Sequence, residues 1–97
     1  MKSQAETNDI TRYVLREVYD ERFRQDQMWG EQNHAPCDYL AILVEEVGEA
    51  AKECVAVRFG LDSADLLAAR RNLRVELIQV AAVAVAMVEA LDREGSA

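Results

Sequence analysis

Residues that form tight turns are scarce in this sequence. Its 97 residues include four glycines and one proline, so the chain offers few positions for the turns that a many-stranded sheet needs. It also contains only two cysteines, too few for a disulfide scaffold, and we expect both to be free thiols. Long helices joined by short loops, forming a single all-α domain over residues 1–97, are therefore the expected architecture.

Basic residues and long apolar runs are scarce as well. Lys and Arg number 11 against 18 Asp and Glu, a net charge of −7, which argues against salt-driven binding to a nucleic acid polymer. It still allows a nucleotide that is bound through a cation. The first ten residues lack the apolar core of a signal peptide, and the longest apolar stretch is shorter than the about 20 residues that span a bilayer. We therefore expect a cytoplasmic protein without a membrane partner.

The apolar pattern predicts three helices. The first is expected over residues 10–28, with Asn8 or Asp9 as its N-cap and with residues 1–8 disordered. A loop follows, and a second helix is expected over residues 39–58, with Asp38 as its N-cap and Gly60 as its C-terminal stop. One face of this second helix carries apolar residues at intervals of three and four, namely Leu40, Leu43, Val44, Val47, Ala51 and Cys54.

The third helix, expected over residues 64–91, is unusually apolar. From Leu77 to Val88 its only polar residue is Gln79, so apolar side chains surround the whole helix, which requires burial on more than one side. We infer a helical bundle of three main helices per chain that homo-oligomerisation completes, as a homo-dimer or as a dimer of dimers, that is, a homo-tetramer. The alternative is a monomeric three-helix bundle.

Four glutamates interrupt the apolar pattern of the second helix. They are Glu45, Glu46, Glu49 and Glu53, and each lies within about one helical turn of the next. Each like-charge pair at this spacing costs roughly 0.2–0.5 kcal/mol on an isolated helix. Taken alone, such a stripe is most simply a solvated helix face, with Glu53 as a solvated member.

The third helix adds Glu76 and, one turn later, Gln79. A short connection makes the second and third helices antiparallel neighbours, so these two side chains can face the acidic stripe. Several carboxylate and amide oxygens between helices, with little compensating positive charge, form a site for a hard divalent cation, Mg²⁺ or Mn²⁺.

The motif Glu45-Glu46-x-x-Glu49, followed by Glu76-x-x-Gln79, resembles the E-E-x-x-E…E-x-x-D signature of the MazG-like all-α nucleoside triphosphate pyrophosphohydrolases. The stretches QMWGEQNH (27–34), LAILVEEVGEAAKE (40–53) and RVELIQVAAVAVAMVEAL (74–91) are similar to the small MazG-like branch. The resemblance covers roughly residues 10–92. It implies a helical bundle that assembles as dimers or dimers of dimers.

The resemblance also implies an activity, which is the Mg²⁺-dependent cleavage of a (d)NTP to a (d)NMP and pyrophosphate, with removal of noncanonical nucleotides as one role. It implies Glu46, Glu49 and Glu76 as metal ligands, and Glu45 as a supporting residue or as the catalytic base. Gln79 departs from the signature, which has Asp there. Its amide oxygen can still bind a metal, but it supplies no charge, so we expect a weaker metal site, altered substrate choice or loss of activity.

Four further residues are candidates for substrate binding. Trp29 can stack on a nucleobase or anchor its loop against the bundle, and Asn33 and His34 can hydrogen-bond a base or sugar, although a single His in a loop is more often exposed. Lys52 can reach a phosphate or remain in solvent. The sequence contains neither a glycine-rich phosphate-binding loop nor a Glu-x-x-His metal motif on the acidic helices.

Two alternatives to an active enzyme remain. Because of Gln79, the chain can be a MazG-like protein that binds a nucleotide or a metal without turnover. It can also be an acidic helical interaction module whose glutamate stripe contacts a basic partner.

Overall fold

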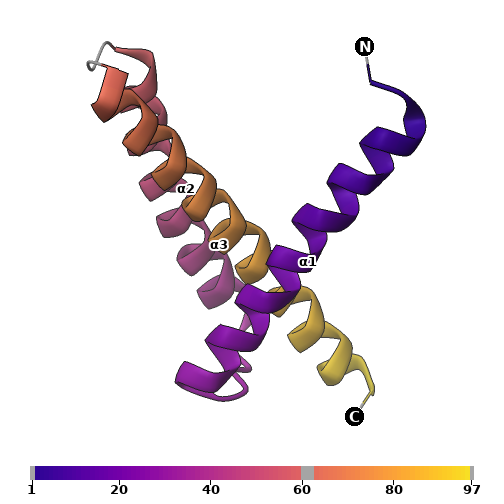
Figure 1. Cartoon of the computed structure of the whole chain (residues 1–97). Helices are drawn as coiled ribbons and strands as arrows, with labels where there is room; N and C mark the ends of the chain where they lie inside the picture. The colour runs from indigo at the N-terminus through magenta and orange to yellow at the C-terminus, as the bar shows by residue number, and fades with distance from the viewer. Residues whose placement is uncertain (1, 60–62, 97) are drawn as a thin grey trace.

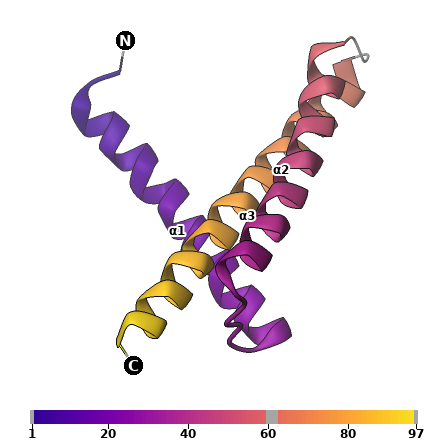
Figure 2. The same cartoon turned by 180° about the vertical axis from the view of Figure 1, so that it is seen from behind.

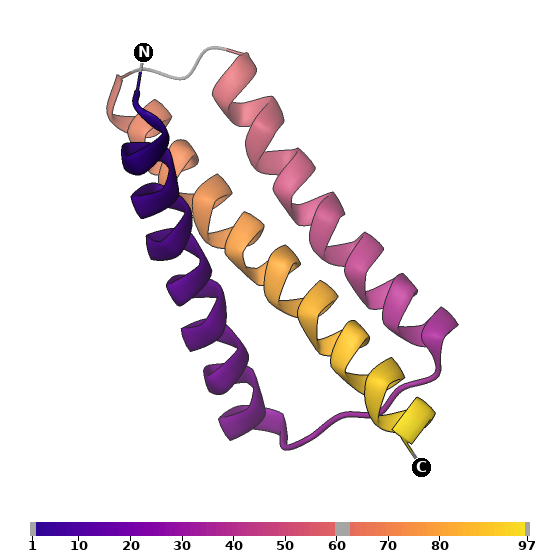
Figure 3. The same ribbon diagram turned by 90° about the vertical axis from the view of Figure 1, so that its right-hand side faces the viewer.

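The computed structural model describes residues 2–59 and 63–96, which form three α-helices: α1 (Gln4–Trp29), α2 (Pro36–Arg58) and α3 (Ser63–Ser96). These residues contain no β-strand, which confirms the all-α prediction. α2 lies antiparallel along α3, and α1 packs against α3 from another side (Figure 1). Figure 3 shows α3 between the other two helices, and within the described ranges α1 and α2 do not pack directly on each other.

α1 begins at Gln4 rather than near residue 10, because Ser3 is its N-cap instead of Asn8 or Asp9. The Ser3 hydroxyl oxygen accepts a hydrogen bond from the Glu6 N–H at 3.2 Å, which satisfies one of the free donors of the first turn. Residues 4–8, expected to be disordered, are therefore helical. The helix ends at Gly30, whose φ of 72° is readily adopted by glycine.

α2 begins earlier than expected, at Pro36, and Asp38 lies in its first turn instead of capping it. Proline suits this position because its missing N–H is one that the helix would leave unpaired. Ala35 is extended, as expected of a residue before proline, with φ −59° and ψ 149°. The predicted stop at Gly60 lies outside the described residues. α3 extends beyond the predicted end at residue 91 to Ser96.

The core is small and consists largely of alanine. The buried apolar residues are Val18, Tyr39, Ala50, Ala69, Ala82, Ala86 and Ala90, and among the described residues no large side chain is fully buried. Alanines allow the backbones of neighbouring helices to approach closely. Tyr39 packs against Ala86, Ala90 and Met87, and its hydroxyl donates a hydrogen bond to the Gln32 carbonyl at 2.6 Å, which fixes the loop before α2.

Much apolar surface remains exposed. Of the apolar stripe on the second helix, only Leu43 is half-buried, while Leu40, Val44, Val47, Ala51 and Cys54 are exposed. Such a stripe normally faces the core of the domain, and here it does not. The N-terminal half of α1 also diverges from the α2–α3 pair, as seen from both sides in Figures 1 and 2. No described helix is long and apolar enough to cross a membrane.

Candidate functional site

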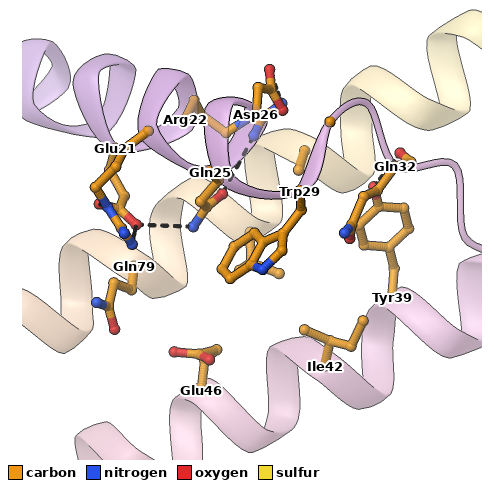
Figure 4. Close-up of a pocket in the computed structure, with 14 residues that line it drawn as sticks. Glu21, Arg22, Gln25, Asp26, Trp29, Gln32, Tyr39, Ile42, Glu46 and Gln79 are labelled. Atoms are coloured by element: carbon orange, nitrogen blue, oxygen red, sulfur yellow. Dashed lines mark hydrogen bonds and ion pairs between the residues drawn. The ribbon is translucent and has the colours of Figure 1, made fainter.

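A pocket of about 290 Å³ lies where the three helices come together. The C-terminal half of α1, the first half of α2 and the middle of α3 form its walls (Figure 4). Its lining includes Glu21, Arg24, Gln25 and Trp29 from α1, Tyr39, Ile42 and Glu46 from α2, and Gln79, Val83 and Ala86 from α3. The pocket thus has aromatic and aliphatic walls and, at one end, a group of polar side chains.

Glu46 is the acidic residue of α2 that reaches this pocket, where it lies across from Gln79 (Figure 4). Partial burial raises the pKa of the Glu46 carboxyl, and the negative charges of Glu76, Glu49, Glu45 and Glu21 raise this pKa further. Like charges from all three helices therefore act on one carboxylate. Of the acidic stripe of α2, Glu46 is therefore the residue that lies close to the Glu76–Gln79 turn of α3.

Glu76 is half-buried, and its Oε2 atom is shielded from solvent without a hydrogen-bond partner among the described residues. A buried polar atom left unpaired costs about 1–3 kcal/mol, and more when the group is charged. Lys52, the basic residue expected beside the acidic stripe, pairs instead with Glu49, with 3.5 Å between Nζ and Oε1 and both side chains exposed. An additional cation would therefore stabilise this arrangement.

α1 contributes an acidic residue that the motif did not indicate. Glu21 accepts hydrogen bonds from Arg24 Nε and Nη2, both at 2.7 Å, and from Gln25 Nε2 at 3.2 Å. The hydrogen bonds from Arg24 lower the pKa of Glu21, so this carboxylate is ionised and paired. An acid and an arginine three residues apart are common on exposed helices, so the sequence carried no signal that placed Glu21 beside Glu46.

The predicted site residues fall into several groups. Trp29, Glu46 and Gln79 line the same pocket, and Trp29 points into it (Figure 4). Glu45 and Glu49 are exposed outside the pocket. Glu53, expected to be solvated, is half-buried, because its position on the helix turns it partly towards α3.

Asn33 and His34 lie apart from this pocket. They line a separate, open concavity beside the C-terminal part of α3, together with Glu31 and Arg93. Arg93 Nε donates a hydrogen bond to Asn33 Oδ1 at 3.0 Å, and His34 Nε2 lies 2.8 Å from Gln32 Oε1. The structure does not bring these two residues together with Glu46.

The carboxylates do not form a closed metal cage in this conformation. Within residues 2–59 and 63–96, no group of three or more His, Cys, Asp or Glu side chains has the arrangement that would hold a metal ion. The oxygen-only donor set of Glu46, Glu49, Glu76 and Gln79 is nevertheless chemically suited to Mg²⁺ or Mn²⁺. Binding would require their side chains to turn towards a common centre.

Comparisons with known proteins identify no relative of this chain. No family model matches the sequence, and no curated protein or solved structure shows significant similarity to it. The interpretation of the site therefore rests on its geometry and on the residues of the motif.

Proposed function

We propose that the protein is a MazG-like, Mg²⁺-dependent nucleoside triphosphate pyrophosphohydrolase that cleaves a (d)NTP to a (d)NMP and pyrophosphate. One observation carries the proposal: carboxylates from α2 and α3 gather beside a pocket that Trp29 lines, with the pKa of Glu46 raised and one Glu76 oxygen unpaired. A divalent cation is the partner that this charge distribution lacks, and triphosphates are substrates that bind through such a cation.

Each residue then has a defined role. Glu46, Glu49 and Glu76 would hold the cation through carboxylate oxygens, and Gln79 would add its amide oxygen. A bound Mg²⁺ would neutralise negative charge on the phosphates, which is the main requirement of phosphoryl transfer. Glu45 is exposed and would accept the proton of the attacking water at a carboxylate oxygen. Trp29 would stack on the base, and Lys52 would reach the phosphates from the exposed side of α2.

Substrate binding by Asn33 and His34 needs a different geometry from the one described. Both residues bond to neighbours in their own loop or on α3, so they would contact a nucleotide only after the loop rearranged. We therefore assign them a lower priority than Trp29 in mutagenesis. A substitution of Asn33 by Ala that raises KM without changing kcat would restore them to the binding site.

The proposed activity is tested by pyrophosphate release from a panel of NTPs and dNTPs, each with Mg²⁺ or Mn²⁺. We expect turnover of at least one substrate by the wild-type chain, and loss of about 100-fold or more in kcat/KM for Glu49→Gln, since charge neutralisation carries the catalysis. Glu6→Gln is the matched control, because Glu6 is exposed in the first turn of α1. Absence of turnover by the wild type, or equal turnover by Glu49→Gln, would refute the enzymatic proposal.

A nucleotide- or metal-binding protein without turnover is the second candidate, and Gln79 favours it. The amide of Gln79 lies in the pocket at the position where the resembling family has a charged residue, so the site has one negative charge fewer. This candidate predicts binding of a nucleotide with Mg²⁺ in calorimetry, without pyrophosphate release. If the chain is instead an acidic interaction module, we expect neither nucleotide binding nor pyrophosphate release. A basic partner should then bind the exposed Glu45 and Glu49.

A further inference from the structure

Two arginines of α1, Arg22 and Arg24, line the pocket, and they differ in how many of their donors are already bonded. Arg22 donates through all three of its guanidinium nitrogens to oxygen atoms of three side chains, namely those of Glu89, Gln25 and Asp26. Arg24 is less engaged, because its oxygen partners come from a single side chain, that of Glu21. Arg24 is therefore the arginine of the pocket that can still bind a ligand.

Glu21 holds Arg24 by one edge of its guanidinium group. Nε and Nη2 of Arg24 donate to the two carboxylate oxygens of Glu21, both at 2.7 Å, and this paired geometry fixes the plane of the guanidinium. The only other acceptor bonded to Arg24 among the described residues is the sulfur of Met28, 2.7 Å from Nη1. A thioether sulfur is a weak acceptor, so the edge formed by Nη1 and Nη2 remains able to bind a stronger one.

The acidic member of this pair is the more firmly fixed. The side chain of Glu21 is 12% exposed, against 49% for Arg24, and the buried Gln25 donates a third hydrogen bond to Glu21 at 3.2 Å. The hydrogen bonds from Arg24 also lower the pKa of Glu21, which keeps its carboxylate ionised. Glu21 is thus an anchor within the protein, and the guanidinium of Arg24 is the accessible group.

The pocket combines an aromatic wall with a polar end. Figure 4 shows Glu21 at the same end of the pocket as Glu46 and Gln79, with Trp29 further along it. Arg24 precedes Trp29 by five residues on α1, about 7.5 Å along the helix axis at 1.5 Å per residue. A ring stacked on Trp29 can therefore direct a sugar and its phosphates towards Arg24.

We propose that Arg24 is a phosphate-binding residue of this pocket, and that Glu21 orients its guanidinium so that the Nη1–Nη2 edge bonds to phosphate oxygens. This inference rests on the proposed function for the identity of the ligand, a nucleoside triphosphate. Arginine suits the task, because its planar fork holds a carboxylate on one edge and a phosphate on the other. Lys52 does not line the pocket, so Arg24 supplies a positive group where Lys52 does not.

Charge determines which phosphates Arg24 can help to bind. The charged side chains of the lining are three acids and two arginines, namely Glu21, Asp26, Glu46, Arg22 and Arg24, so the pocket as a whole does not attract a free anion. A triphosphate that carries Mg²⁺ suits both walls, since Glu46 on α2 favours the cation and Arg24 on α1 favours the phosphate. We therefore expect Arg24 to bind phosphates of a Mg²⁺–nucleotide complex.

Calorimetry with nucleotides that cannot be cleaved tests this role without turnover. The probes are the α,β-methylene triphosphates of adenosine, guanosine, cytidine and uridine, each with Mg²⁺, and the same nucleosides without phosphate. For Arg24→Met we expect triphosphate affinity to fall by about 10-fold or more, because a charge-assisted contact is lost, while nucleoside affinity is unchanged. Arg24→Lys restores the charge without the fork, so it should recover only part of the affinity.

Arg12→Met is the matched control. Arg12 also lies on α1, three residues after its acidic partner Asp9, and both side chains of this pair are exposed outside the pocket. The control should leave triphosphate affinity unchanged. Circular dichroism should show the same helicity for the control and for both Arg24 variants, since Arg24 is half exposed to solvent.

A double-mutant cycle tests the orienting role of Glu21. If Glu21 fixes the guanidinium, Arg24→Met should cost less triphosphate affinity in a chain that already carries Glu21→Gln than in the wild type. Equal losses in the two chains would overturn this role of Glu21.

Four results would overturn phosphate binding by Arg24. They are a wild type that binds none of the triphosphates, unchanged triphosphate affinity in Arg24→Met, an equal loss of nucleoside affinity in that variant, and an equal loss of triphosphate affinity in Arg12→Met. The pyrophosphate assay can fail separately. Binding through Arg24 without cleavage would refute only the enzymatic proposal, whereas cleavage with kcat/KM unchanged by Arg24→Met would refute only this inference.

Discussion

At the scale of single residues, the environment of Glu46 disfavours the ionised form of its carboxyl. Burial and four neighbouring glutamates raise its pKa, while the nearby cations Arg24 and Lys52 bond to Glu21 and Glu49 instead. The Oε2 atom of Glu76 is also buried, and it has no hydrogen-bond partner in the described part of the chain. Such groups are stable only at a cost to the fold, and costs of this kind are concentrated at functional sites.

This cost predicts the pH dependence of the metal-free protein. A carboxyl whose pKa is higher in the folded than in the unfolded chain lowers stability as pH rises through these two values, because folding then disfavours ionisation. Glu46→Gln removes the penalty. In EDTA at pH 7, we expect the variant to have a melting temperature a few degrees above that of the wild type. Below pH 4.5, the ordinary pKa of a glutamate, the two proteins should melt at the same temperature. A variant that melts below the wild type at pH 7 would contradict this.

Gln79 gives a second prediction at the same scale. Gln79→Asp adds a negative charge beside Glu46, so we expect divalent-cation affinity in calorimetry to rise by about 10-fold, the effect of one further charge-assisted contact. Gln79→Ala is the control, because it removes the amide oxygen of the side chain without adding charge. Unchanged or weaker binding by the Asp variant would place Gln79 outside the metal site.

At the scale of the helices, α1 is held to the rest of the molecule by few interactions. Arg22, whose side chain is only 12% exposed, donates hydrogen bonds to Glu89 of α3 at 2.6 and 3.0 Å. It also donates to Gln25 at 3.3 Å, which in turn donates to Glu21. Docking of α1 on α3 and the wall of the pocket therefore share one network.

Removal of this network should loosen the pocket. For Arg22→Met we expect a loss of about 1–3 kcal/mol in the free energy of unfolding, because Glu89 and Gln25 lose a mostly buried charged donor. The fluorescence of Trp29, the only tryptophan, should shift to longer wavelength as α1 separates from the pocket. Arg16→Met is the matched control, since the Arg16–Asp20 pair is exposed at both ends and should contribute almost nothing.

The contact of α3 with its neighbours depends on small side chains. Ala82 is 0% exposed, so Ala82→Leu must displace a neighbouring helix, at a cost of about 1–3 kcal/mol. Urea unfolding measures this cost, and Ala68→Leu on the exposed side of the same helix is the control. Equal stability of the two variants would show that the α3 contacts are looser than the structure indicates.

At the scale of the whole molecule, the chain combines an excess of negative charge with an extended shape of 51 × 33 × 22 Å. If its carboxylates gather for a divalent cation, MgCl₂ should raise the melting temperature more than NaCl of equal ionic strength, since screening by salt is then the same. Glu76→Gln should reduce the difference between the two salts. Equal effects of both salts on the wild type would indicate screening alone.

The particular elements show how far the sequence could lead. Helical periodicity predicted three helices and a loop after the first, which the structure places at residues 30–35. Pro36 begins α2 instead of lying in that loop. Helix starts were less predictable, because Ser3 caps α1 instead of Asn8 or Asp9. α2 begins at Pro36 with Ala35 as its N-cap, instead of being capped by Asp38. The proximity of Glu46 to Gln79 could be predicted, because α2 and α3 were expected to be antiparallel neighbours. The position of Glu21 in the same pocket could not be predicted, because it depends on where α1 crosses α3.

The sequence by itself determined the all-α class, the approximate helices and the acidic motif, because backbone propensity and side-chain spacing are local properties. Only the tertiary structure decided which face of α2 is turned inward, which placed Glu46 in a pocket and left Val44 and Val47 exposed. The physical reason is that α2 has two faces able to pack, one mixed and acidic and one regular and apolar. Their assignment depends on how α2 packs against α3.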